Sequence, residues 1–170
     1  TVYLKARRHI QLNVNLQLAG VGTVEVIPKA LNSLLVQGTV YYSNSNNGLT
    51  QAAYTTQALM PGKRSQYGSY NRFLSMNNLY LVTNTSSKAI TFNLAVKNIK
   101  ATVLINKSYT MKPYSTIVLD LSKSTTFKTE VDSYGTAALS APDTRMLAIQ
   151  SVRMRPIGDI MDYAMPTAVR

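Results

Sequence analysis

Alternation of apolar and polar side chains is the dominant pattern along the chain. From His9 to Leu18 the sequence HIQLNVNLQL has an apolar side chain at every second position, namely Ile10, Leu12, Val14, Leu16 and Leu18. Successive side chains of a β-strand point to opposite faces, so this pattern predicts a half-buried strand with asparagine and glutamine on its other face. The same period predicts strands at 89–97 and 115–121, and shorter strands are expected at 78–83 and 102–106.

Turn-forming residues separate these runs at short intervals. Asn47-Gly48 lies between LLVQGTVYY and LTQAAYTTQ, and Asn-Gly is a strong hairpin signal because both central positions of a type I′ turn need positive φ. Pro61-Gly62 ends this hairpin, and NTSSK at 84–88 separates two further strands. Many short strands with regular turns predict an all-β fold, a sandwich or barrel of antiparallel strands.

Two parts of the chain contain similar segments in the same order. Residues 4–61 match residues 109–166 through the pairs QLNVNL and TIVLDL, GTVEVIP and GTAALSAP, VQGTVYY and IQSVRMR, and ALMP and YAMP. Their offset, about 105 residues, indicates an internal repeat whose insertions fall in loops. We therefore expect about one and a half copies: an incomplete sandwich at 1–62 that lacks its first strands, and a complete one at 63–170.

The incomplete first copy has a structural consequence. A sandwich without two or three of its strands exposes apolar surface and unpaired sheet edges, which favour association with another chain. A neighbouring subunit could supply the strands by β-augmentation, with the strand of Ile10, Leu12, Val14, Leu16 and Leu18 as the subunit contact. Two alternatives stay open: the chain is a piece of a longer repeat protein, or residues 1–61 add strands to one larger sheet system.

Three short motifs resemble those of a known group of modules. An aromatic-rich L-x-L-x-x-N strand occurs at Leu79–Asn84, a P-x-x-S/T turn at Pro113–Thr116, and Tyr134-Gly135 opens the next strand. In this arrangement the chain resembles the tandem Ig-like β-sandwich modules of secreted and cell-surface bacterial proteins. The resemblance covers residues 70–166 well and 4–61 in part. It implies an Ig-like sandwich and an extracellular setting, and it implies no catalytic residue.

The formal net charge of the chain is +11 at pH 7, which favours polyanionic partners. The basic residues are scattered and form no basic tail, so an acidic polysaccharide is a more plausible partner than nucleic acid. Tyrosines beside arginines can stack on sugars or bases. The residues predicted to contact a polyanion or glycan are Arg7, Arg8, Lys63, Arg64, Tyr67, Tyr70 and Arg72. No apolar run is long enough for a membrane-spanning helix, and TVYLKARRHIQ lacks the apolar core of a signal peptide.

The sequence lacks the usual parts of a catalytic or metal site. It contains no cysteine, which excludes thiolate ligands, and its one histidine, His9, follows two arginines that repel cations. Asp159 and Asp162 supply two carboxylates without a recognised calcium loop. No nucleophile elbow, dinucleotide-binding fingerprint or P-loop motif occurs. We therefore predict a non-enzymatic protein with no cofactor and no metal site.

These observations support three hypotheses about function, in decreasing order of preference. The first is an extracellular structural or assembly subunit of a filament, sheath or surface layer, which is a homo-oligomer or polymer that uses strand complementation. The second is a surface module that binds a polyanion or glycan. The third is a small basic coat protein of jelly-roll type, against which the missing arginine-rich arm argues.

Overall fold

The structure is a computed structural model. It describes residues 2–5, 9–12, 24–30, 34–43, 50–57, 65–122, 132–142, 146–157 and 160–168. Ten strands and one short 3-10 helix make up the regular structure of these residues. In chain order they are β1 (Gln37–Ser43), β2 (Thr50–Gln57), β3 (Ser65–Asn71), η1 (Phe73–Ser75), β4 (Asn77–Asn84), β5 (Ile90–Asn98), β6 (Val103–Met111), β7 (Thr116–Asp120), β8 (Tyr134–Ser140), β9 (Leu147–Ile157) and β10 (Ile160–Ala168).

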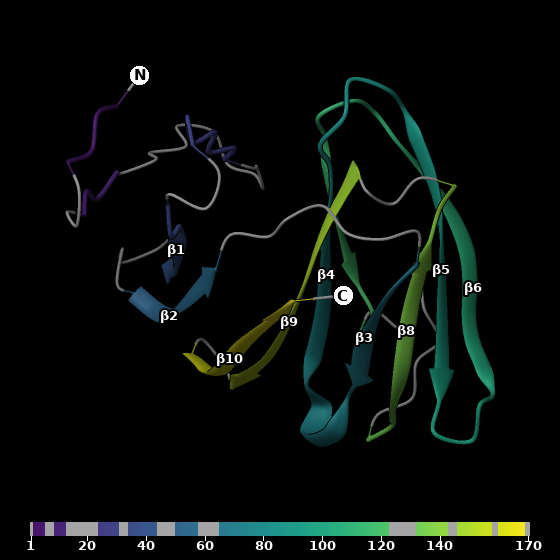
Figure 1. Ribbon diagram of the computed structural model, residues 1–170. Helices are drawn as coiled ribbons and strands as arrows, with labels where there is room; N and C mark the ends of the chain where they lie inside the picture. The colour runs from purple at the N-terminus through teal and green to yellow at the C-terminus, as the bar shows by residue number, and fades with distance from the viewer. Residues whose placement is uncertain are drawn as a thin grey trace.

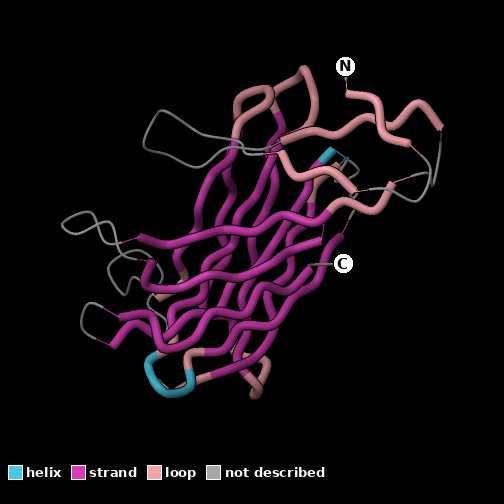
Figure 2. Tube along the Cα trace, turned by 90° about the vertical axis from the view of Figure 1, so that its left-hand side faces the viewer, coloured by secondary structure: helices cyan, strands magenta, loops and turns pink. Residues whose placement is uncertain are grey.

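The strands form two four-stranded sheets and one hairpin, and every pairing is antiparallel. One sheet has the order β3-β8-β5-β6 and the other has the order β10-β9-β4-β7 (Figure 1). The hairpin of β1 and β2 forms a separate two-stranded sheet, and β2 lies near β10 of the second four-stranded sheet. Figure 2 shows that strands make up most of the described chain, with loops gathered at their ends. The predicted all-β, antiparallel class is confirmed.

Several individual strands agree with the alternation in the sequence. The segments predicted at 78–83, 89–97, 102–106 and 115–121 correspond to β4, β5, β6 and β7. The segments on either side of Asn47-Gly48 form β1 and β2, which pair with each other from Gln37–Gln57 to Ser43–Thr50. The structure therefore confirms these predicted strands, which turn signals separate in the sequence.

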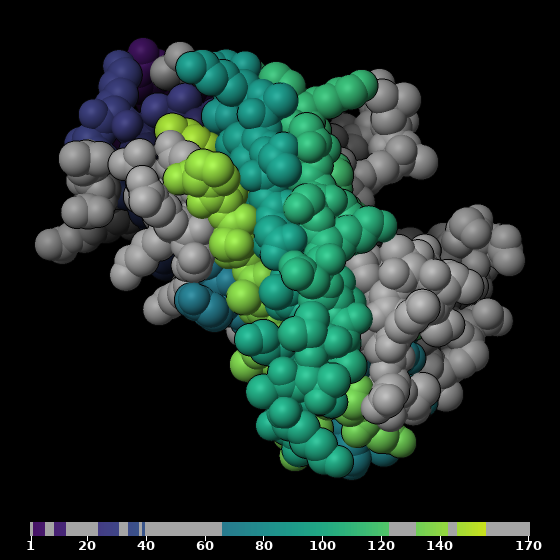
Figure 3. All heavy atoms as spheres, turned by 90° about the vertical axis from the view of Figure 1, so that its right-hand side faces the viewer, coloured from purple at the N-terminus to yellow at the C-terminus, as the bar shows by residue number. Residues whose placement is uncertain are grey.

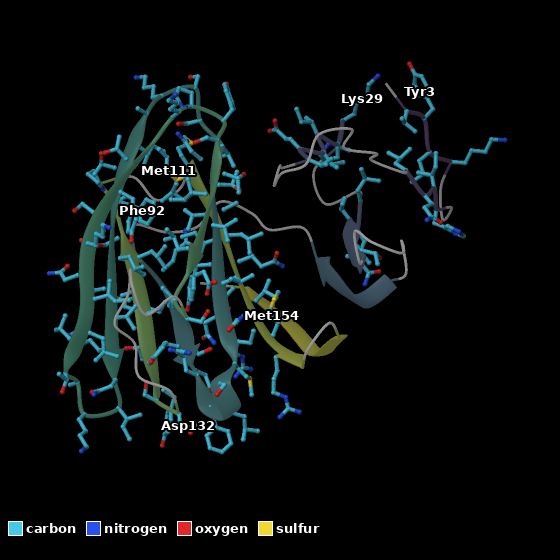
Figure 4. All side chains as sticks on the ribbon, turned by 180° about the vertical axis from the view of Figure 1, so that it is seen from behind. Tyr3, Lys29, Phe92, Met111, Asp132 and Met154 are labelled. Atoms are coloured by element: carbon cyan, nitrogen blue, oxygen red, sulfur yellow. The ribbon has the colours of Figure 1, made fainter. Side chains whose placement is uncertain are left out.

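The core lies between the two four-stranded sheets. Both sheets contribute side chains to it, and Phe92 and Met111, labelled in Figure 4, are each 1% exposed. Phe92 of β5 also stacks on Tyr109 of β6, with ring centroids 5.5 Å apart. The buried apolar members are Tyr70, Tyr80, Val82, Phe92, Leu94, Val96, Ile105, Met111, Leu119, Leu121, Ala137, Leu139, Leu147 and Ile149. Their contact across the interface makes the two sheets a sandwich.

Gly135 allows β8 to pass close to β5 within this sandwich. A Cβ at this position would overlap the carbonyl oxygen of Lys97 and crowd the backbone of Asn98. Gly135 pairs with Asn98 in the register of the two strands, so the crowding lies on the ladder itself. The Tyr-Gly motif noted in the sequence is therefore a packing requirement.

The described part of the N-terminal region differs from its predicted repeat partner. Residues 24–28, matched in sequence with β8, form no strand, whereas the matched segments of β1 and β9 are both strands. β1 pairs with β2 and β9 pairs with β10, both antiparallel, whereas the repeat itself stays a prediction. The division into domains at residue 62 stays a prediction.

Candidate functional surfaces

The predicted polyanion-contact residues have different positions in the structure. Arg7, Arg8, Lys63 and Arg64 lie outside the described residues. Tyr67 is 63% exposed on the outer side of β3. The remaining two, Tyr70 and Arg72, are buried, so their side chains are not available to a ligand on the surface.

Hydrogen bonds connect these two residues to the loop before β8. The hydroxyl group of Tyr70 is hydrogen-bonded to that of Ser133, and the backbone N–H of Arg72 donates to the carbonyl oxygen of Ser133 over 2.8 Å. In return, the N–H of Asp132 donates to the carbonyl oxygen of Arg72 over 3.1 Å, and Oδ1 of Asp132 accepts from the N–H of Leu74 over 2.7 Å. The contacts join the loop after β3 to the loop before β8, at the end of the sandwich where Figure 4 labels Asp132. Their role is structural.

The outer face of the β3-β8-β5-β6 sheet is polar. Because Phe92, Leu94 and Val96 of β5 point into the core, the intervening side chains point outward. The outward side chains of β5 and β6 are joined in a ladder. The hydroxyl groups of Thr91 and Thr110 lie 2.8 Å apart, Asn93 Nδ2 donates to Asn106 Oδ1 over 2.8 Å, and Ser108 Oγ lies 3.4 Å from Asn93 Oδ1.

Tyr67 lies in register with small residues on this face. It pairs with Ala138 of β8, Ala138 pairs with Ala95 of β5, and Ala95 pairs with Asn106 of β6. All four point outward, because their neighbours in each strand point into the core. One row across the sheet therefore presents an exposed aromatic ring, two methyl groups and an amide. We call this surface, together with the Thr91–Thr110 and Asn93–Ser108 pairs, the polar face.

Five exposed lysines lie on the β5–β6 hairpin and in the loops at its ends. They are Lys88, Lys97, Lys100, Lys107 and Lys112. The chain has no acidic residue from Val26 to Leu119, so no carboxylate within the hairpin offsets these charges. Figure 3 shows β5 and β6, in teal and green, running the length of one side of the molecule.

Side-chain caps hold the lysine-bearing loops in place. Nδ2 of buried Asn84 donates to the carbonyl oxygens of Lys88, over 2.7 Å, and Lys112, over 3.0 Å, which brings these two residues together at one end of the hairpin. At the other end, Oδ1 of Asn98 accepts from the N–H groups of Lys100 and Thr102, each over 3.0 Å. These hydrogen bonds therefore hold the backbone at Lys88, Lys100 and Lys112 in place.

The outer face of the β10-β9-β4-β7 sheet carries a cluster of apolar side chains. Val152 and Met154 of β9 are 0% and 5% exposed, and Leu79 and Leu81 of β4 pack against them. These side chains point away from the main core, and Figure 4 shows Met154 on the side toward β10. At the edge of the same face, Val118 of β7 pairs with Leu81 and is 43% exposed. We call this surface the apolar face.

The predicted subunit-contact strand is only partly described. Ile10 and Leu12 are 50% and 60% exposed, and residues 9–12 form no strand. Val14, Leu16 and Leu18 lie outside the described residues. Other large apolar residues of the N-terminal region are also exposed: Val2, Tyr3, Leu4, Val24, Val26, Ile27, Leu34 and Leu35.

Groups suited to catalysis or metal binding are sparse in the described segments. Within them, no cluster of three or more His, Cys, Asp or Glu residues could hold a metal ion. Burial raises the pKa of Tyr80 far above its usual value, and the positive charge of Arg153 opposes this rise. The Tyr80 hydroxyl donates to the carbonyl oxygen of Ser69 over 2.7 Å, so it links the two sheets. In the same segments, no helix has the length and apolarity needed to cross a membrane.

The fold and its surfaces define an all-β protein of two packed antiparallel sheets. Comparison with protein-family models found no match, and comparison with curated proteins found no significant match. One solved structure, the crystal structure of Thermotoga maritima 1070, is similar with a TM-score of 0.52 and 14% sequence identity. The similarity covers 65% of this chain and 96% of that chain, and at this identity it concerns the fold alone.

Sequence reasoning did not identify the polar face as a unit. Its members come from four segments between Tyr67 and Ser140, and only the strand order brings them together. A local signal existed in the alternation of threonine, asparagine and lysine with apolar residues in β5, which marks an outward polar row. The sequence pattern did not show that Tyr67 shares this row.

Proposed function

We propose that the protein is a non-catalytic, extracellular structural subunit that assembles by strand complementation between copies. In this proposal, residues 63–170 of one subunit form an Ig-like sandwich. Residues 1–62 of a neighbouring subunit pair with it. The observation that carries the proposal is the exposure of alternating apolar residues near the N-terminus, with Ile10 and Leu12 at 50% and 60%. A segment with these exposed apolar side chains gains free energy when it pairs as a strand and another chain covers them, at about 25 cal/mol per Å² of apolar area.

The edge of β7 is the acceptor that we propose for this strand. Among the described strands, β7 pairs with β4 alone, and it presents Val118 next to Leu81. A strand added at the edge of β7 would widen its sheet, so it would enlarge both the apolar face and the interface between the two sheets. The other sheet has β3 and β6 at its edges, and β6 has Lys107 on the side toward the core, opposite Leu94. A charged side chain in this position disfavours the addition of another strand.

The oligomeric state as a function of concentration tests the proposal. Sedimentation velocity and negative-stain imaging should show wild-type oligomers or filaments that grow with concentration. The double variant Ile10→Asn/Leu12→Asn removes the apolar side of the strand and should remain monomeric, and Val118→Lys at the acceptor edge should do the same. Gln11→Asn, on the opposite side of the same strand, is the matched control and should assemble normally.

Two results would contradict the proposal. One is a wild-type protein that stays monomeric at high concentration, and the other is assembly of Ile10→Asn/Leu12→Asn that equals the wild type. Circular dichroism and urea unfolding should first show that each variant keeps its fold, which we expect because Ile10, Leu12 and Val118 are all exposed.

A further inference from the structure

We propose that the polar face binds an acidic polysaccharide, with Tyr67 stacking on a sugar ring and Lys97 pairing with an acidic group. This inference does not depend on assembly through β7, because the polar face belongs to the other sheet. It changes the surface predicted from the sequence: Tyr67 is retained, Tyr70 and Arg72 are replaced by side chains from β5 and β6, and the rest are undescribed.

The chemistry of the polar face matches that of a sugar polymer. Thr91, Asn93, Asn106, Ser108 and Thr110 provide hydroxyl and amide groups, which both donate and accept hydrogen bonds as sugar hydroxyls do. Because these groups already bond to one another across β5 and β6, they are held in fixed positions before a ligand arrives, which lowers the entropy cost of binding.

Tyr67 supplies the apolar contact that sugar rings need. Its side chain is 63% exposed. Ala138 and Ala95 follow it in the same row, and their small side chains leave room for a sugar ring beside the tyrosine. Tyrosine combines an apolar ring with a polar hydroxyl group, so it contacts both the ring face and the hydroxyls of a sugar. A polymer laid along this row would reach the amide of Asn106 at its far end.

The charge of the surrounding residues selects an acidic polymer. Lys97 points outward from the polar face, and Lys88, Lys100 and Lys112 flank it in the loops at both ends of the hairpin. β5 has nine residues, so the loops are about 30 Å apart at about 3.3 Å per residue. The absence of acidic residues between Val26 and Leu119 leaves this positive potential uncompensated within the hairpin.

The spacing of the lysines favours a polysaccharide over nucleic acid. On the polar face, Lys97 lies seven positions along β5 from Ile90, next to the loops that carry Lys88 and Lys112, which corresponds to about 23 Å. A nucleic-acid strand has a charge about every 3.4 Å, and its binding depends on many phosphate contacts close together. A polymer with mostly hydroxyl groups and fewer charges fits this surface better.

Binding to defined polymers tests the inference. Polygalacturonate, neutral dextran and single-stranded poly(dT) should be compared by affinity electrophoresis and isothermal titration calorimetry at several salt concentrations. We expect the wild type to bind polygalacturonate best, with an affinity that falls as salt rises. The double variant Tyr67→Ala/Lys97→Ala should lower this affinity at least tenfold.

The matched control is Tyr3→Ala/Lys5→Ala, which removes the same two exposed side-chain types and the same charge from the N-terminal region. It should change the affinity by less than twofold. Equal losses in the two variants would overturn the inference, since they would show a non-specific charge effect. Stronger binding to poly(dT) than to polygalacturonate would overturn it in favour of nucleic acid, and binding to dextran alone would remove the role of charge. Sedimentation of both variants separates this result from the assembly proposal, because neither substitution touches β7 or the strand at Ile10.

Discussion

The two sheets share one core but present opposite outer faces. On the β3-β8-β5-β6 sheet, threonine, asparagine and serine side chains form a hydrogen-bonded ladder, and Tyr67 is exposed among alanines. On the β10-β9-β4-β7 sheet, Val152 and Met154 are buried against Leu79 and Leu81. A sheet that is buried on both faces belongs in an interior, whereas a sheet with a polar outer face is stable when that face contacts water. The difference teaches that the outer face of one sheet contains apolar side chains that are already buried within the chain, whereas the outer face of the other sheet contacts solvent.

The largest expected effect tests whether the apolar face is a second interior. Val152→Asp places a carboxylate at a position that is 0% exposed, and we expect a loss of at least about 3 kcal/mol in the free energy of unfolding. Asn106→Asp puts the same carboxylate on the polar face and keeps the acceptor for Asn93, so its effect should be within about 0.5 kcal/mol. Urea unfolding measures both, and similar losses would remove the distinction between the faces.

An intermediate effect tests the hydrogen bond that joins the sheets. Tyr80→Phe removes the bond from the Tyr80 hydroxyl to the carbonyl oxygen of Ser69, and we expect a cost of about 1 kcal/mol at neutral pH. Burial also raises the folded-state pKa of Tyr80. Its contribution is therefore complete below the unfolded-state pKa of about 10, and it declines above that pH because the unfolded chain releases the proton first, by about 1.4 kcal/mol per pH unit.

Unfolding measured between pH 8 and 11 checks this contribution. The wild type should lose stability more steeply than Tyr80→Phe above pH 10. Equal slopes would show that Tyr80 ionises as readily in the folded protein as in the unfolded chain.

The smallest effect compares two threonine pairs, one on each outer face. Thr83 and Thr116 join β4 to β7 with hydroxyl oxygens 2.9 Å apart, and Thr83 is 8% exposed. Thr91 and Thr110 form an equivalent pair at 2.8 Å on the polar face, where both are exposed. Water can replace the lost partner only at the exposed pair, so we expect Thr116→Val to cost about 1 kcal/mol and Thr110→Val less than about 0.5 kcal/mol. Thermal and urea unfolding should rank them in this order, and the reverse order would contradict the assignment of the faces.

The local part of the fold could be predicted from the sequence. The strands at 78–83, 89–97 and 115–121 and the hairpin around Asn47-Gly48 were found, because a period of two and a turn are properties of neighbouring residues. The order of strands within each sheet could not be predicted, since the pairing of β5 with β8 joins residues about forty positions apart.

The candidate contact residues show the same limit. Tyr67 and Tyr70 look alike in QYGSYNR, yet Tyr67 is 63% exposed and Tyr70 is 1% exposed. Their opposite environments follow from the odd spacing of three, which places them on different sides of β3. The sequence did not reveal which side faces the core, because buried Gln66 on the inner side is polar and bonds the carbonyl oxygen of Leu147.

The placement of Lys107 on the inner side of the β6 edge has a consequence for the geometry of the proposed assembly. If β6 is closed to further strands and the donor segment adds at β7, each subunit joins its neighbours through two different surfaces, the donor segment and the β7 edge. Contacts between unlike surfaces are heterologous, and they repeat in one direction unless the rotation between subunits closes a ring. The polymer would then have two distinct ends, would elongate by addition of subunits in a fixed orientation, and would present its polar faces at regular intervals along its length.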